Sequence, residues 1–561
     1  MPGCHSELKK SKNILREIIM EYSLTQAKPN ILLVTSVSGS GFNLAPPLGL
    51  YRLKQYLNER GYNCDILDLD VDDKNDYLAA ISSGYYKLIG LSVSHFKMEE
   101  DLNLLWSLKK LCLANNADVY FFAGGQEATL NYEEWLKAGF EFILTGYAED
   151  SLFQVCETIY NYGEKSMKAK FTDVKGIIYY DAAGKVINNF QDKLTAEIFR
   201  KYSYTQELKM DIPYEKYWSI MRQNYKVDKT SDRKFVIENV RLYTTSHCPR
   251  ACGFCSSQNF LRVSQNEKCS IIMLSAEEIF NLLVFNINKY GARSFLFSDD
   301  DFLVGNVIGI SRIEKLCEMI IEAKEKNVIP GEVMFNCQAR IADFISNKNR
   351  IIRSDLIKLM KKAGFNSIGL GVETFSDRLL RSSSINKVGI SANDCMRVLD
   401  ELLVHKVTPQ INIITGIPEY KPHELLATIK TAIKYIGLGC DIAVTPKMFS
   451  IPGAPIHYRD DYSTVKKYII DPLTQREVVR VDYIVPFDEG MQRLIEVIDV
   501  ESKKTLNKYF ASQENDLIPK LIIGLSIFLT IAEFFKDENL SESIKQLLNA
   551  EIGKIKQNGG K

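Results

Sequence analysis

The sequence predicts an α/β protein in which an open, doubly wound, Rossmann-like domain precedes a partial, TIM-like (β/α)6 barrel. Three observations support this fold class. Five short apolar runs alternate with amphipathic helices over residues 29–162, six further strand-helix steps occupy 237–456, and the region 457–561 is mostly helical. Such alternation is typical of parallel sheets covered by helices. We therefore expect two α/β units followed by a helical cap.

Composition narrows the class of protein. The 561 residues contain 70 lysines plus arginines and 70 aspartates plus glutamates, so no net charge attracts nucleic acid or an anionic membrane. Twelve scattered cysteines and an N-terminus without an apolar core lead us to expect a reducing, cytoplasmic compartment. The most apolar run, residues 521–532, is shorter than the ~20 residues that span a bilayer. We expect it to form a buried helix.

The first array follows a polar or helical extension at residues 1–28. Its expected helices cover 48–61, 98–116, 131–138 and a stretch from 149. The expected strands are NILLVTSV (30–37), NCDILDLD (63–70), YKLIGLSVS (86–94), DVYFFAGG (118–125) and FEFILTG (140–146). Short apolar runs bounded by turn residues favour buried parallel strands.

Residues 163–236 are interpreted as a connector that contains a hairpin turning at Ala183–Gly184 and a stretch rich in aromatic residues. A second alternation follows. A helix is expected from Ser275, because Glu278 completes a capping box, and others at 309–328, 355–363, 391–406 and 422–437. The strands expected are 238–246, 294–299, 333–340, 367–373, 410–416 and 441–449.

The sequence TTSHCPRACGFC (244–255) places Cys248, Cys252 and Cys255 after the first strand of the second array. Barrels carry their chemistry at the C-terminal ends of the strands. Three interpretations are open: a zinc site with His247 or Cys269 as fourth ligand, three unrelated buried thiols, or a cubane iron-sulfur cluster with one iron left free. The spacing favours the cluster.

This CxxxCxxC loop after the first strand of a six-strand barrel resembles the radical S-adenosylmethionine (SAM) superfamily. The resemblance implies a [4Fe-4S] cluster whose open iron is chelated by the amino and carboxylate groups of SAM. The family's Gly-Gly-Glu segment is replaced by FSDDDF (297–302), and Asn412 replaces the first glycine of a GxIxGxxE motif. The positions implied for SAM are Phe254, Asp299, Asp300 or Asp301, Arg340, Glu373, Ile414, Gly416 and Glu419.

The first array is similar to the cobalamin-binding domain that precedes the barrel in one subclass, on the stretches 45–68, GLSVS (90–94) and AGGQE (123–127). In that fold the nucleotide tail of cobalamin enters between the third and fourth strands. The resemblance implies contacts from Ser92 and Ser94 and a passage at Gly124–Gly125. The DxHxxG loop that supplies a cobalt ligand is absent from TSVSGSGFN (35–43), and His95 is a candidate ligand from below.

Together these features imply an enzyme that cleaves SAM to a 5'-deoxyadenosyl radical, abstracts hydrogen, and transfers methyl from methylcobalamin to an unactivated carbon. A radical cyclisation or rearrangement without methylation and an inactive cobalamin sensor or carrier are the alternatives. The expected partners are a flavodoxin- or ferredoxin-type reductant and a small-molecule or peptide substrate, with no nucleic acid. Residues 457–561, with Tyr458, Tyr462 and Tyr468, are expected to cap the barrel.

Overall fold

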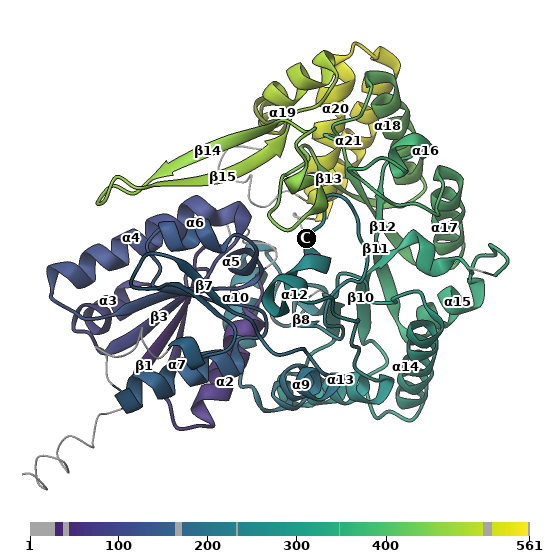
Figure 1. Ribbon diagram of the computed structural model, residues 1–561. Helices are drawn as coiled ribbons and strands as arrows, with labels where there is room; N and C mark the ends of the chain where they lie inside the picture. The colour runs from purple at the N-terminus through teal and green to yellow at the C-terminus, as the bar shows by residue number, and fades with distance from the viewer. Residues whose placement is uncertain are drawn as a thin grey trace, which may run out of the picture.

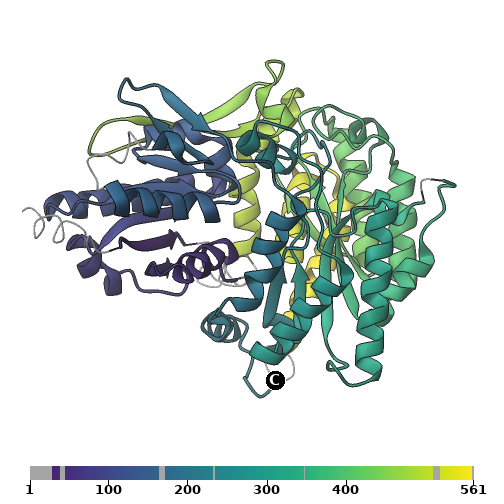
Figure 2. The ribbon, with the colours of Figure 1, turned by 60° about the horizontal axis from the view of Figure 1, so that its bottom comes forward.

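The structure is a computed structural model that describes residues 28–37, 44–162, 171–231, 234–346, 348–508 and 519–558. The expected N-terminal extension lies almost wholly outside these ranges, as does most of the TSVSGSGFN loop. Figures 1 and 2 show, from two directions, the first α/β domain lying beside the barrel.

The first sheet has seven strands within the described residues, in the order β2-β1-β3-β4-β5-β6-β7. Neighbouring strands from β2 to β5 are parallel, as the alternation predicts. The strands are β1 (Asn30–Thr35), β2 (Cys64–Asp68), β3 (Tyr86–Ser92), β4 (Tyr120–Gly124), β5 (Phe142–Leu144), β6 (Ile177–Tyr180) and β7 (Val186–Asn189). The helices are α2 (Leu48–Asn58), α3 (Asn75–Ser82), α4 (Met98–Ala114), α5 (Gln126–Leu130), α6 (Tyr132–Lys137) and α7 (Glu149–Tyr162), with the 3-10 helix η1 (His95–Lys97).

The hairpin expected in the connector forms, and it extends the first sheet. Strand β6 pairs antiparallel with β5, and β7 pairs with β6. Gly184 provides the left-handed turn residue, with φ of 77°. The rest of the connector contains η3 (Phe171–Asp173), α9 (Ala196–Arg200), the π-helix η4 (Lys201–Thr205), η5 (Glu207–Lys209), α10 (Tyr214–Asn224) and α11 (Lys234–Ile237).

The second sheet is the predicted partial barrel, with six parallel strands among the described residues in the order β13-β12-β11-β10-β9-β8. Ser275 caps its first long helix in the predicted capping box with Glu278. The strands are β8 (Asn239–Leu242), β9 (Ser294–Phe297), β10 (Met334–Arg340), β11 (Phe365–Glu373), β12 (Thr408–Ile414) and β13 (Asp441–Thr445). The helices are α12 (Ser257–Gln265), α13 (Ala276–Tyr290), α14 (Val307–Glu325), η6 (Ile341–Phe344), α15 (Ser354–Ala363), α16 (Asp377–Leu380), α17 (Ala392–Val404) and α18 (Pro422–Gly437).

The C-terminal region is mostly helical, with one element that the pattern did not predict. After η7 (Pro455–Tyr458), β14 (Thr464–Ile470) and β15 (Glu477–Ile484) form an antiparallel hairpin, which reaches across to α6 in Figure 1. The Val479 N–H donates a 2.7 Å hydrogen bond to Glu134 of α6, and Lys467 pairs with Glu99 of α4. The hairpin therefore ties the C-terminal region to the first domain.

The apolar run at 521–532 forms the predicted buried helix, α20 (Lys520–Phe534), between α19 (Glu489–Asn507) and α21 (Glu538–Asn558). A Cβ at Gly524 would lie 3.0 Å from Val444 of β13, so the missing side chain lets α20 pack closely on the edge strand of the barrel. No helix in the described part of the chain is long and apolar enough to cross a membrane.

The two faces of the first sheet belong to two different apolar cores. Neighbouring residues of a strand face opposite sides, so Leu33 joins the core shared with the barrel, and Leu32 joins a core beneath α4 and α6. Ile469 and Val478 of the hairpin complete the second core. One continuous core thus fixes the first domain against the barrel, which positions the site between them.

Candidate active site

The three cysteines lie in the loop between β8 and α12. Cys248 is buried, and Cys252 and Cys255 are partly buried. The Cys255 N–H donates to the Cys252 carbonyl in a tight turn, and the Cys248 N–H donates to the Ser257 hydroxyl at 3.3 Å. The loop thereby brings three thiols to the C-terminal end of the first barrel strand.

Backbone contacts from two distant segments hold this loop. The Gly253 N–H donates to the Ile385 carbonyl at 3.2 Å, and the Ile456 N–H donates to the Gly253 carbonyl at 2.9 Å. A Cβ at Gly253 would collide with the carbonyl oxygens of Ser383 and Ser384. Glycine is therefore required within this cysteine loop, a need that the sequence did not reveal.

The surroundings of the three thiols oppose their ionisation in the absence of a bound cation. Burial raises the pKa of Cys248 to about 12 and that of Cys255 to about 11, and it also raises the pKa of Cys252. A bound cation is what stabilises thiolates in such surroundings. No three His, Cys, Asp or Glu side chains of the described residues converge on a single ion, whereas cubane ligands each bind a different iron.

The possible fourth ligands of a zinc site lie elsewhere. The Cys269 thiol contacts the Ser270 carbonyl, and the charges nearest to it are Lys193 and Glu267. His247 accepts or donates a 2.9 Å hydrogen bond with Ser246, and it lines the cavity between the domains. In the described part of the chain neither side chain joins the thiols in a group that could hold one ion, and three thiols suit a cluster with one open iron.

The three aspartates after β9 have different partners. Asp299 is buried and accepts hydrogen bonds from the backbone and hydroxyl groups of Thr244 and Thr245. Asp301 is buried and accepts from Arg340 at 2.8 Å. Two of the three carboxylates therefore hold the barrel together.

Asp300 is the exposed member of this trio. Its carboxylate accepts from the Ser257 hydroxyl, which in turn accepts from the Cys248 N–H, and it lines the cavity. Its position beside the cysteine loop suits the carboxylate that the resemblance assigns to the methionine amino group.

Arg340 and Glu373 end two adjacent strands, as expected, and both are paired. Arg340 also binds Asp343 at 2.5 Å, with one fifth of its side chain exposed. Glu373 has an unusual φ of 65° and lies 2.8 Å from the Lys387 ammonium. The neighbouring charges of Cys252 include all of Lys387, Glu373 and Arg340, so both strand ends adjoin the cysteine loop.

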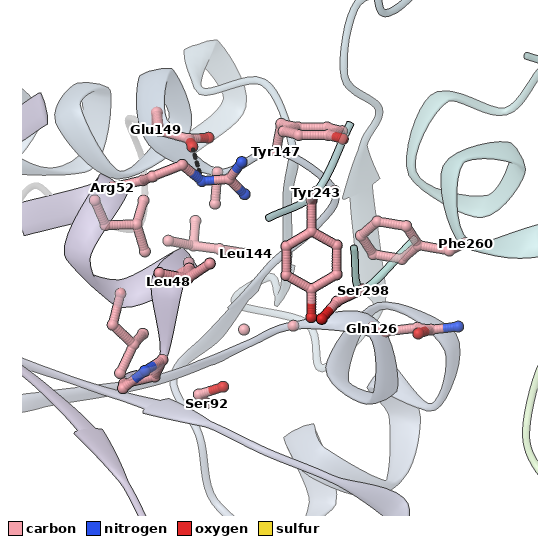
Figure 3. Close-up of a pocket in the computed structure, with 18 of the residues that line it drawn as sticks. Leu48, Arg52, Ser92, Gln126, Leu144, Tyr147, Glu149, Tyr243, Phe260 and Ser298 are labelled. Atoms are coloured by element: carbon pink, nitrogen blue, oxygen red, sulfur yellow. Dashed lines mark ion pairs between the residues drawn. The ribbon is translucent and has the colours of Figure 1, made fainter. Parts of the chain in front are cut away.

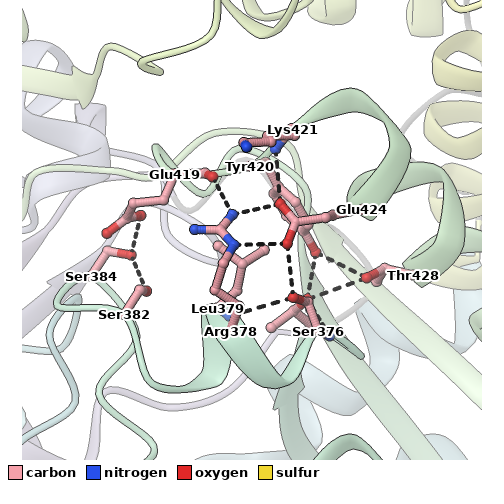
Figure 4. A network of polar contacts seen from close by, with 11 residues as sticks. Ser376, Arg378, Leu379, Ser382, Ser384, Glu419, Tyr420, Lys421, Glu424 and Thr428 are labelled. Carbon is pink, nitrogen blue, oxygen red and sulfur yellow. Dashed lines mark hydrogen bonds and ion pairs between the residues drawn. The ribbon is translucent and has the colours of Figure 1, made fainter.

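The Gly416 and Glu419 region serves packing and a polar network. A Cβ at Gly416 would lie 2.6 Å from the backbone of Lys447, because the ends of β12 and β13 approach closely there. The Glu419 carboxylate accepts from the hydroxyl groups of Ser384 and Tyr462, each at 2.6 Å. Figure 4 shows Ser384 and Glu419 beside the Arg378–Glu424 pair. Phe254 is partly buried against the core.

A cavity of about 600 Å³ lies between the first domain and the barrel. Figure 3 shows side chains of both domains turned toward it, with Arg52 and Glu149 on one side and Tyr243 and Phe260 on the other. Arg52 and Glu149 form an ion pair of 3.6 Å. The cavity wall also includes Ser92, Gly124, Gly125, Gln126, Thr245, His247, Ser298 and Asp300.

Three of the five predicted cobalamin positions line this cavity and two do not. Ser92 and Gly124–Gly125 lie at its wall, at the ends of β3 and β4. Gly125 has φ of 104° and ψ of 179°, which is essentially restricted to glycine. Ser94 and His95 are not among the lining residues, and the His95 ring is instead buried 3.6 Å from Glu127.

The comparisons with known proteins agree with this geometry. The radical SAM superfamily model matches residues 242–432, and the B12 binding domain model matches residues 35–155. No curated protein matches the chain.

Solved structures share the fold over nearly the whole chain. One is the cobalamin-dependent SAM radical enzyme OxsB with aqua-cobalamin and SAM bound, at a TM-score of 0.62 and 15% identity, covering 94% of this chain and 80% of that one. Another is the radical SAM methyltransferase TsrM from Kitasatospora setae with cobalamin and a [4Fe-4S] cluster, at 0.60 and 12%, covering 93% and 100%.

The cysteine loop at the barrel mouth and the cavity against the first domain define a radical SAM protein with a B12-binding domain. The chain is a cobalamin-dependent radical SAM enzyme. Its cofactors are a [4Fe-4S] cluster, SAM and cobalamin, and enzymes of this superfamily need an external reductant.

Two features of the site had no signal in the sequence. Lys387 lies 135 positions beyond Cys252, and Arg52 lies in an amphipathic helix where an exposed arginine is ordinary. Only the folded chain brings Lys387 beside the cysteine loop and Arg52 to the cavity.

Proposed function

We propose that the enzyme transfers a methyl group from cobalamin to an unactivated carbon of a small-molecule or peptide substrate. The observation that carries this proposal is the shared cavity, which Gly125 and Ser92 line from the first domain and Thr245, Ser298 and Asp300 line from the barrel. A cobalamin in the first domain would thereby face the SAM side of the barrel.

When bound, the cluster and SAM supply a 5'-deoxyadenosyl radical, and methylcobalamin supplies the methyl group. Cys248, Cys252 and Cys255 would hold the cluster, and Asp300 would accept a hydrogen bond from the methionine ammonium. Arg340 places a positive charge at the end of β10, and Glu373 places a negative charge at the end of β11. No general base is needed at the reacting carbon, since the hydrogen leaves as an atom.

The residues that we assign to cobalamin belong to the first domain. Gly124 and Gly125 present backbone without side chains to the cavity, and Ser92 offers a hydroxyl next to them. His95 lies outside the cavity wall beside Glu127, so we assign it no bond to cobalt. Ser92, Gly124 and Gly125 are therefore the residues that would hold the cobalamin.

The decisive experiment does not require the substrate. Holoenzyme containing reduced cobalamin is incubated anaerobically with SAM bearing a deuterated methyl group, and cobalamin is analysed by mass spectrometry. Methyl transfer predicts deuterated methylcobalamin, because each cycle must restore the methyl donor.

The other outcomes separate the alternatives. Radical cleavage of SAM without any labelled cobalamin would favour cyclisation or rearrangement and contradict the proposal. A carrier would bind cobalamin and yield no iron after anaerobic reconstitution, whereas a cubane cluster gives about four irons per chain. A flavodoxin- or ferredoxin-type protein is the reductant we expect.

A further inference from the structure

Lys387 is a buried lysine at the mouth of the barrel. It lies in the loop between α16 and α17, and only 10% of its side chain is exposed. Its ammonium lies 2.8 Å from the Glu373 carboxylate and donates a 2.5 Å hydrogen bond to the Gly371 carbonyl. Lysine is almost never buried without a partner, and here Glu373 is that partner. The loop therefore holds a charged ammonium group at the end of β11.

The charges around Cys252 are mostly positive. Lys387, Arg340 and Arg250 are its positively charged neighbours, and Glu373 is a negatively charged one. Lys387 is therefore one of three cations beside this thiol.

The other two thiols face the opposite charge. Asp300 and Asp301 raise the pKa of Cys248, and Asp300 and Glu373 raise that of Cys255. The Ser257 hydroxyl also links Asp300 to the Cys248 N–H. The cysteine loop therefore meets a carboxylate at Cys248 and the lysine-bearing segment beside Cys252.

The segment that carries Lys387 is fastened to the cysteine loop. The Ile385 carbonyl accepts from the Gly253 N–H at 3.2 Å, and the Asn386 amide donates to the Ala251 carbonyl at 2.6 Å. A Cβ at Gly253 would collide with this same segment. These contacts fix the separation of the lysine from the loop.

We propose that Lys387 is a positioning residue for charge, which raises the reduction potential of the cluster held by Cys248, Cys252 and Cys255. One electron passes from a flavodoxin- or ferredoxin-type reductant, which is oxidised, to the cluster, which is reduced. A fixed neighbouring cation stabilises the more negative, reduced state. The inference depends on the cluster and is independent of methyl transfer.

The test is a redox titration of the reconstituted cluster without SAM, followed by electron paramagnetic resonance. Lys387→Met keeps the length of the side chain and removes its charge. We expect the ratio of reduced to oxidised cluster at a fixed potential to fall about tenfold, which corresponds to about 59 mV for one electron. Lys387→Arg should retain the potential.

Removing one partner of a buried ion pair can prevent folding, so a second comparison is included. Glu373→Gln keeps the lysine and should shift the potential upward. Glu373→Gln and the double variant Lys387→Met/Glu373→Gln differ by Lys387 alone, and the double variant should be the harder to reduce.

Arg378→Met is the matched control. Arg378 is half exposed and pairs with Glu424 (Figure 4). Its loss should leave the potential unchanged. Equal potentials in wild type and Lys387→Met with equal iron content, or in Glu373→Gln and the double variant, would overturn the proposal. So would the same shift in the Arg378 control.

Discussion

The amide N–H of Gly253 donates a hydrogen bond to the carbonyl of Ile385, and no side chain fits between the two segments. The glycine of the cysteine loop is thus a point of backbone-to-backbone contact, where the loop after β8 meets the loop between α16 and α17. The contact joins residues that are 132 positions apart and supports the loop that carries the three thiols.

Gly253→Ala should weaken cluster retention. The added methyl group would displace the loop from Ser383 and Ser384, and loss of support around metal ligands typically lowers affinity about tenfold or more. Iron and sulfide analysis after anaerobic reconstitution measures the loss. Gly437→Ala, in helix α18 with nothing near its Cβ, is the control and should bind iron normally. Full iron content in Gly253→Ala would show that the contact is dispensable.

Gly125→Ala should weaken cobalamin binding by about tenfold. Alanine at φ of 104° and ψ of 179° carries strain of about 1–3 kcal/mol, which the loop can relieve only by moving at the cavity wall. Equilibrium titration followed by visible absorbance measures the affinity. Gly439→Ala has a similar φ of 105° but lies after α18, so it should lose stability without losing cobalamin. Equal affinities in both variants would argue against the assigned passage.

Glu207 should make stability depend on pH. Burial raises its pKa to about 8, so between its ordinary pKa and pH 8 the folded protein holds a proton that the unfolded chain releases. The free energy of unfolding therefore falls as pH rises through this window. Melting temperatures at pH 6 and pH 8 should differ more for wild type than for Glu207→Gln.

The exposed Glu322 provides the control for this pH effect. Its pKa is lowered by Lys326, so it is ionised in both states throughout the window. Glu322→Gln should therefore keep the wild-type pH dependence. An unchanged pH dependence in Glu207→Gln would mean that its carboxyl is ionised in the folded protein.

The fold was largely predictable because apolar runs of strand length alternate with helices throughout. The buried helix at 521–532 and the capping box at Ser275 were also predicted correctly. The hairpin of β14 and β15 was missed, although TVKKYII and EVVRVDYI are rich in β-branched residues. Its contacts with α4 and α6 are long-range, and no local pattern contains them.

Candidate site residues could be predicted where a sequence motif or the end of a strand marks them. The three cysteines, Gly125 and Asp300 could be picked out by motif and strand position, and Gly125 and Asp300 both line the cavity between the two domains. The motif could not distinguish Asp300 from the structural Asp299, because that depends on hydrogen bonds from Thr244 and Thr245. Burial and pairing are properties of the folded chain alone.

The measurement that tests the account most directly is an anaerobic incubation of reconstituted enzyme with SAM, a strong reductant and methylcobalamin, with 5'-deoxyadenosine measured by mass spectrometry. We expect 5'-deoxyadenosine from the wild type and none from Cys252→Ala, which loses one of three cluster ligands. The absence of 5'-deoxyadenosine from wild type with iron and cobalamin both loaded, or equal amounts from the variant, would contradict it.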